Sequence, residues 1–300
     1  MSYVYHLVTG YSIAALLALS TNLQVGYCGR ITLAQASFFA SAAYTYTLAY
    51  HFWRWPWWAA ILAAVGISVV LGIFLAAPVN RCKVDQFLLV SLIAQACVYS
   101  LIRNWVHSGA PVGSWSNLTN GPYGITALPR PVIAGISLNL EWARTLFALL
   151  LLVLAAGLCW AILSAPFGRL LKAIRDDDWV VRTLGKNISR ARRDAFALAG
   201  GLAALGAIVY VLEMTYIDPS IAGLDESVMI LSTLLIGGSG NRLLGALCGT
   251  LFFIGVPEVL RLFQVPIADP SNIRQLLFGV TLIAMIHLRP QGLAGSYRLD

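Results

Sequence analysis

The segment from Phe167 to Asp194 reads FGRLLKAIRDDDWVVRTLGKNISRARRD. It holds eight of the 20 Lys and Arg residues of the chain, although only 11% of all residues are charged. Long apolar runs lie on both sides of it. A strongly basic segment between two apolar runs is typical of a cytoplasmic loop between membrane spans, so this loop orients the spans around it.

The composition indicates an integral membrane protein. Apolar residues make up 59% of the 300 residues, and the mean hydropathy is +0.76. Soluble domains carry roughly 45–50% apolar residues even when Gly is counted. Apolar runs of about 20 residues, the length that crosses a bilayer as a helix, follow one another too closely for a separate soluble domain. We therefore expect one all-α transmembrane helix bundle over residues 1–300.

The order of apolar runs and basic turns predicts the topology. The runs are 7–25, 33–50, 59–77, 87–106, 146–163, 195–212, 228–256 with a break, and 276–288. This count gives about eight spans with interrupted or re-entrant pieces, an external N-terminus and a cytoplasmic C-terminus. The turns that carry Arg81 and Lys83, Arg242, and Arg289 then lie on the side of the basic loop, as the positive-inside rule requires. The rule also explains the net charge of +7 without a nucleic-acid partner.

The longest polar segment outside the basic loop is 108–139. It is rich in Gly, Pro, Ser and Asn and is too polar to span a membrane. In the predicted topology it is an external loop on the side opposite the basic loop. Long ordered loops in compact proteins are often functional.

The first two apolar runs are separated by residues 26–30, which contain two Gly, and polar side chains lie near this break. Irregular backbone at membrane depth is tolerated only where protein or a water-filled cavity satisfies it. We therefore expect a broken helix that lines a pathway, with Asn22, Gln24, Gln35 and Tyr44 as candidate pathway residues. The alternative for each is a hydrogen bond that joins two helices of the bundle. A second Gly-rich break contains Gly237, Gly238 and Gly240.

Residues for catalysis are not apparent in the sequence. The four His residues are scattered without metal-ligand spacing, and no phosphate-cradling Gly-rich loop is present. Glu213 lies at the end of a span, where a carboxylate can be solvated, so proton-driven transport is not favoured. We expect a non-catalytic chain without a metal or a bound cofactor, whose energy source lies in another subunit.

The basic loop has the pattern of two short amphipathic helices. Apolar residues recur at helical spacing from Phe167 to Ile174, with basic residues on the other faces. The run Asp176 to Asp178 can start a second helix, since carboxylates favour helix N-termini, and Gly185 can end it. Such a pair fits a docking element for a soluble ATPase. The alternative is a loop whose charge only orients the chain.

Five stretches, in order along the chain, resemble the branched-chain amino-acid ABC transporter permeases of the LivM type. They are Gly26-Tyr27-x-Gly29 with Leu33, Gln35, Ala36 and Phe38; Thr119-x-Gly121-x-x-Gly124-Ile125; Ser164 to Arg169 with Ala173 to Asp178 and Leu184-Gly185; Gly237-Gly238-x-Gly240 with Gly245-Ala246; and Arg289-Pro290-x-Gly292-Leu293-x-Gly295. The sequence departs from the pattern at Ala34, at Arg30 and over 120–123. These departures concern the hairpin and the external loop, so the resemblance does not fix the substrate.

The resemblance implies a type II-like ABC importer permease in the bacterial cytoplasmic (inner) membrane. Such a subunit forms half of a translocation pathway and pairs with a second, related permease as a heterodimer. Two cytoplasmic ATPase subunits use ATP and Mg, and an extracytoplasmic binding protein delivers the substrate. The loop at about 165–194 is then the ATPase-coupling loop. The residues that match the coupling motif are Phe167, Gly168, Arg169, Ala173, Ile174, Arg175, Asp176, Asp177, Asp178, Leu184 and Gly185.

The resemblance leaves the transported solute open. A branched-chain or other amino acid is the first expectation, and urea, short amides or aromatic acids are alternatives within the same family. A stand-alone channel or secondary transporter is the alternative outside the family, since broken helices and Gly-rich turns suit it equally well.

Overall fold

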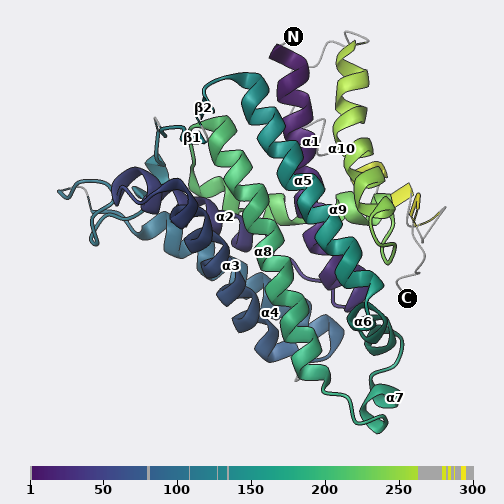
Figure 1. The fold of residues 1–300 in the computed structure, drawn as a ribbon. Helices are drawn as coiled ribbons and strands as arrows, with labels where there is room; N and C mark the ends of the chain where they lie inside the picture. Colours follow the sequence, from purple (N-terminus) through teal and green to yellow (C-terminus); the bar gives the residue numbers. More distant parts are fainter. Residues whose placement is uncertain are drawn as a thin grey trace.

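The computed structural model describes residues 2–79, 82–107, 109–126, 128–133 and 135–262, together with 279–281, 283, 284, 287 and 292–294. The described part is a helical bundle (Figure 1). Its main helices are α1 (Ser2–Thr21), α2 (Gln35–Thr47), α3 (Trp57–Val79), α4 (Val84–Asn104), α5 (Glu141–Ser164), α6 (Pro166–Asp176), α7 (Asp178–Thr183), α8 (Ile188–Met214), α9 (Leu224–Gly237) and α10 (Leu244–Leu262).

Shorter elements extend or connect these helices. Two π-helical turns, η1 (Asn22–Tyr27) and η2 (Leu48–Phe52), prolong α1 and α2. Two 3-10 turns are η3 (Gly121–Tyr123) and η4 (Pro219–Ala222). In the segment 108–139, strands β1 (Val132–Ile133) and β2 (Ile136–Ser137) form a small antiparallel hairpin, with Val132 opposite Ser137. These are the only strands in the part of the chain that the structure describes.

Five described helices are long and apolar enough to cross a membrane: Ser2–Tyr27, Trp57–Val79, Val84–Asn104, Glu141–Ser164 and Ile188–Met214. The predicted all-α membrane bundle is confirmed at this level. The predicted count of about eight spans is not, because the run 33–50 forms a short helix with a π-helical end and the run 228–256 is divided between α9 and α10. The last predicted run, 276–288, lies largely outside the described residues.

The most enclosed long helix is α8. In its most apolar stretch 72% of residues are buried, against 22% for α4, so α8 lies inside the bundle and α4 at its edge. It packs against α1, α2 and α3. Almost all of α2 is buried as well, including the polar residues Gln35 and Ser37. A helix enclosed by protein does not need the length or the apolar surface of a lipid-facing span, which explains why α2 is short.

The two loops predicted on opposite sides of the membrane lie at opposite ends of the bundle. Figure 1 shows α6 and α7 beyond one end, and the β1–β2 hairpin near the N-terminus at the other. The basic loop and the segment 108–139 are therefore separated by the length of the spans.

Candidate functional site

The basic loop folds into two short helices, as the sequence predicts. Pro166 occupies the first position of α6, where the missing N–H costs no hydrogen bond. The apolar face of α6 buries Leu171 and Ile174 against the bundle, and its charged residues lie on the remaining faces. The helix starts directly after α5, with Gly168 so close to the Leu163 carbonyl that no side chain fits there. The corner between α5 and α6 is therefore tightly packed.

Asp177 separates the two helices. Its backbone is extended, and its Oδ1 accepts hydrogen bonds from the N–H groups of Trp179 at 2.7 Å and Val180 at 3.3 Å. This is the N-cap interaction expected from the acidic run. After α7 the chain turns at Gly185, whose φ of +70° is readily adopted only without a Cβ. Both predicted ends of the second helix are thus confirmed.

The first helix of the loop, α6, contacts the first break directly. Arg175 donates a hydrogen bond from Nη1 to the Gly26 carbonyl at 2.7 Å. A Cβ on Gly29 would lie only 2.6 Å from the Cγ of Arg175, so no side chain fits at this position. The φ of Gly29 is +63°. Lys172 Nζ lies 5.2 Å from the centre of the Tyr27 ring, within the range of a cation–π interaction. Two basic residues of α6 therefore hold the irregular backbone that follows α1.

An ion cluster ties α7 and α8 to the same break. Arg192, which is 2% exposed, places Nη2 2.6 Å from Oδ1 and 2.8 Å from Oδ2 of Asp178. Arg30 Nη2 lies 3.8 Å from Asp178 Oδ2, and its Nη1 donates to the Cys82 carbonyl at 3.2 Å. A buried guanidinium is stable only when it is paired, so Asp178 holds both arginines in place. Arg30, where the sequence departs from the family pattern, is thus the partner of Asp178 in the basic loop.

The first break also meets the second. Asn22 donates from Nδ2 to the Asn241 carbonyl at 2.7 Å and accepts from the Gly240 N–H at 3.2 Å. Gly26 lies so close that a Cβ there would come within 2.6 Å of the Gly240 nitrogen. Gly238 and Gly240 both have positive φ, which lets the chain turn sharply between α9 and α10. The basic loop and the two breaks therefore form one contiguous cluster, which we call the joint: α6, α7, the start of α8, residues 22–30 and residues 237–241.

The remaining candidate pathway residues, Gln24, Gln35 and Tyr44, are buried. Gln35 donates from Nε2 to the hydroxyls of Ser20 and Thr21, each at 2.8 Å, and so joins α2 to α1. The Gln24 side-chain amide and the Tyr44 hydroxyl have no hydrogen-bond partner among the described residues. Asn22 and Gln35 thus make the helix-joining bonds that were the alternative. That these four residues line a pathway stays a prediction.

A second charged cluster lies at the opposite end of the bundle and was not predicted as a unit. Glu213 pairs through Oε2 with Arg144 Nε and through Oε1 with His6 Nδ1, each at 3.0 Å. Arg130, in the segment 108–139, donates to the carbonyls of Leu212 at 2.9 Å and of Glu213 at 3.1 Å. Burial lowers the pKa of Arg130, the nearby Arg144 lowers it further, and Glu213 opposes both. The Glu213 carboxylate therefore joins α8 to α1 and α5, and Arg130 anchors the segment 108–139 to the end of α8 through two backbone carbonyls.

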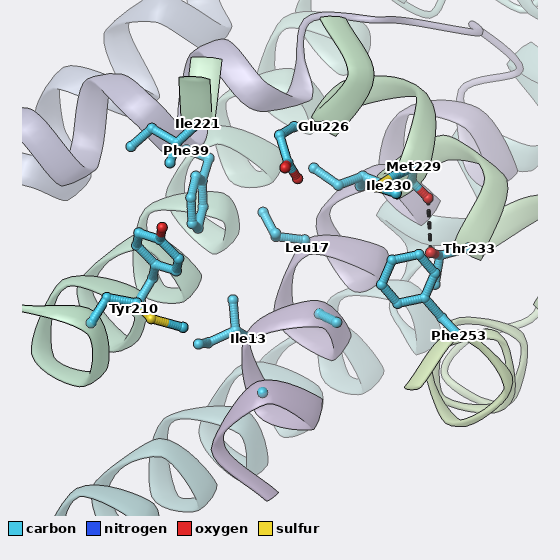
Figure 2. A pocket seen from close by; sticks show the side chains of 13 residues that line it. Ile13, Leu17, Phe39, Tyr210, Ile221, Glu226, Met229, Ile230, Thr233 and Phe253 are labelled. Atoms are coloured by element: carbon cyan, nitrogen blue, oxygen red, sulfur yellow. Dashed lines mark hydrogen bonds between the residues drawn. The ribbon is translucent and has the colours of Figure 1, made fainter. Parts of the chain in front are cut away.

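Sequence reasoning also missed a cavity of about 250 Å³ between α1, α2, α8, α9 and α10 (Figure 2). Two of these helices contribute residues at the spacing i, i+3, i+4 and i+7: Gly10, Ile13, Ala14 and Leu17 from α1, and Glu226, Met229, Ile230 and Thr233 from α9. This spacing was the available signal, since it places four side chains on one helix face. Asn22, Gln24, Gln35 and Tyr44 do not line this cavity.

Comparison with known proteins adds a family relationship. Residues 3–286 match the model of the family described as branched-chain amino acid transport system / permease component. The high-affinity branched-chain amino acid transport system permease proteins LivM of Salmonella typhimurium and Escherichia coli are each 26% identical to the chain, over 93% of it and 67% of their own length. The autoinducer 2 import system permease protein LsrC of Salmonella typhi is 30% identical over 69% of the chain and 56% of its own length. No solved structure matches the chain significantly.

Proposed function

The chain belongs to the branched-chain amino acid transport permease family, and from this premise we propose that it is one of two membrane subunits of an ATP-driven importer. It forms half of the translocation pathway, and a second, related permease forms the other half. Two cytoplasmic ATPases supply the energy, and an extracytoplasmic binding protein delivers the solute. In this proposal the chain itself catalyses no reaction and binds no nucleotide.

The observation that carries the proposal is the contact between Arg175 of α6 and the Gly26 carbonyl. A hydrogen bond at 2.7 Å between a charged donor and the broken backbone links the loop outside the bundle to a helix inside it. A displacement of α6 by an ATPase would therefore reach α1 through direct contacts. A loop that only oriented the chain would not need them.

The outward face of the loop has the chemistry of a docking surface. Trp179 is 77% exposed and Leu184 is 71% exposed, and basic residues such as Arg182 lie beside them. Large apolar side chains that are exposed together mark interaction sites, because leaving them in water is unfavourable. We propose that α7 and the residues up to Gly185 contact the ATPase, whereas α6 passes its motion to the joint.

The family and the position of the joint also support a topology. We propose a type II-like bundle of about eight spans in the bacterial inner membrane, with the N-terminus outside and the C-terminus inside. The end of the bundle that carries α6 and α7 is then cytoplasmic, in agreement with its excess of Arg and Lys. The Arg130 to Glu213 cluster is then external, where the binding protein would dock.

The proposed solute is a branched-chain or other amino acid, after the LivM relatives. The LsrC relatives are described as importing autoinducer 2, so members of this superfamily differ in their solutes. A stand-alone channel remains the competing function. The two functions differ in their need for ATP. A channel would conduct the solute in proteoliposomes that lack the ATPases, whereas an importer would not.

The test is purification of the chain co-expressed with the second permease and the ATPases. We expect the ATPases to co-purify, and we expect Trp179→Glu to reduce the amount recovered by about tenfold, since it places a charge in the apolar contact. Trp115→Glu is the matched control, because Trp115 is 79% exposed but lies in the segment 108–139 at the other end. Equal ATPase recovery with both variants would remove α7 from the docking surface.

A further inference from the structure

The start of α9 is held at the middle of a membrane-spanning helix. Gln95 is buried and has 11 residues of α4 before it and nine after it. At a rise of about 1.5 Å per residue, it lies about 14 to 16 Å from the two ends of α4. Its Nε2 donates to the carbonyls of Gly223 at 2.6 Å and Ala222 at 3.2 Å. Its Oε1 accepts from the Ser227 hydroxyl at 2.7 Å. The first turn of α9 therefore lies at about half the depth of this span.

A second path of hydrogen bonds, which leads to α8, indicates the same depth. The Ser227 hydroxyl accepts from the Ala36 N–H at 3.0 Å. The adjacent Gln35 donates to the Ser20 hydroxyl, which in turn donates to the Ala199 carbonyl at 2.6 Å. Ala199 has 11 residues of α8 before it and 15 after it. Both α4 and α8 therefore place Ser227 near the middle of a span.

Two exposed carboxylates lie at this depth. Asp225 and Glu226 are in the first turn of α9, between Gly223 and Ser227, and both are exposed. Leu224 beside them is 46% exposed. Charged residues in membrane spans face the interior of the protein or a water-filled cavity, because lipid solvates them poorly. Leu224, Asp225 and Glu226, which we call the acidic turn, are not enclosed by the described residues of this chain, so we infer that this face of α9 does not lie against lipid.

Hollows lie on both sides of the acidic turn. One of about 480 Å³ separates it from Ala96 and Tyr99 of α4. The other is the cavity of about 250 Å³ in Figure 2, where Glu226 lies beside Leu17 and Phe39. A water molecule takes up about 30 Å³ in the liquid, so each hollow has room for several. The acidic turn therefore projects between two spaces that can hold water.

We propose that the acidic turn faces the water-filled pathway between this chain and the second permease. Water in this pathway solvates the carboxylates of Asp225 and Glu226 at a depth where lipid does not. The inference rests on the proposed function, because the second permease supplies the other wall of the pathway. A dry contact between the acidic turn and the second permease is the alternative, and it would exclude water from both side chains.

The experiment measures how fast single cysteines react with a water-soluble, membrane-impermeant thiol reagent, trimethylammonium-ethyl methanethiosulfonate. The complete complex is held in lipid nanodiscs, which leave both faces open to the reagent. It carries Asp225→Cys, Leu224→Cys or Ile93→Cys in a Cys97→Ser background, since Cys97 is exposed. Leu224→Cys keeps both carboxylates, so its result does not depend on a lost charge. Ile93 is the matched control, because it is 62% exposed, lies two residues before Gln95 and lines neither hollow.

We expect Asp225→Cys and Leu224→Cys to react at least about tenfold faster than Ile93→Cys, because the reactive thiolate forms readily in water and poorly in an apolar surrounding. Equal rates at the three positions overturn the proposal. Slow reaction at both positions of the acidic turn also overturns it and assigns the turn to a dry contact.

Leucine uptake tests whether the water beside the acidic turn belongs to the pathway. In proteoliposomes that contain the complete complex and the binding protein, treatment with the reagent should abolish ATP-dependent uptake by Leu224→Cys, because the added group occupies the pathway. The same treatment should leave uptake by Ile93→Cys unchanged. Unchanged uptake after complete modification of Leu224→Cys overturns the proposal.

The same measurements distinguish this inference from the proposed function. If wild-type uptake does not require ATP while the acidic turn reacts fast, the importer assignment fails and the acidic turn still faces water. If wild-type uptake requires ATP and the acidic turn reacts no faster than Ile93→Cys, the inference fails and the importer stands.

Discussion

Replacement of Arg175 by Ala tests whether the joint transmits force. The side chain of Arg175 is 8% exposed, and its hydrogen bond to the Gly26 carbonyl is 2.7 Å long. Hydrogen bonds to charged groups contribute about 1.5–3 kcal/mol, so the variant should weaken the link between α6 and the first break by about 2 kcal/mol. This corresponds to roughly a 30-fold change in the equilibrium between the states in which α6 and the first break are in contact and separated.

The assay is the ratio of solute imported to ATP hydrolysed in proteoliposomes that contain the complete complex. We expect this ratio to fall at least tenfold for Arg175→Ala while ATP hydrolysis continues, because the ATPases still dock through α7. Arg193→Ala is the matched control, since Arg193 is half-exposed and forms an ion pair with the adjacent Asp194 rather than with the first break. An unchanged ratio for Arg175→Ala in a complex that assembles normally would refute the reasoning.

Two further substitutions test the other contacts of the joint. Asp178→Asn should destabilise the complex by about 2 kcal/mol or more, because it removes the carboxylate that pairs with the buried Arg192. The melting temperature of this variant in detergent should fall below that of an Asp194→Asn control. Equal melting temperatures would contradict the role of the Arg192–Asp178 pair. Asn22→Ala should lower the free energy of unfolding by about 2–4 kcal/mol, because it removes both hydrogen bonds to the second break. Hydrogen exchange at the Gly240 amide should accelerate in Asn22→Ala and not in Ser12→Ala, whose hydroxyl donates to the Val8 carbonyl of its own helix. Equal exchange in the two variants would show that Asn22 does not hold the two breaks together.

Features that depend on neighbouring residues were predictable. The apolar runs, the basic loop and the division of that loop at Asp177 follow from hydrophobic burial and from capping, which act over a few residues. The stop at Gly185 follows from its backbone freedom. The family relationship was likewise visible in short motifs. The count of about eight spans was less secure, because α2 is enclosed by other helices and an enclosed helix need not be as long as the bilayer is thick.

Contacts between distant segments were decided by the tertiary structure alone. Arg175 and Gly26 are 149 residues apart, and Gly240 and Asn22 are 218 residues apart. No local pattern specifies which broken helix a basic residue will reach, because that depends on how the helices pack. For the same reason no sequence pattern indicated the cavity, whose lining comes from helices that only packing brings together. The sequence by itself determined which segments are helices and which end carries the charge, since these depend on local hydrophobicity. The packing of the helices decided that the basic loop and the two breaks contact one another, because those contacts join residues far apart in the chain.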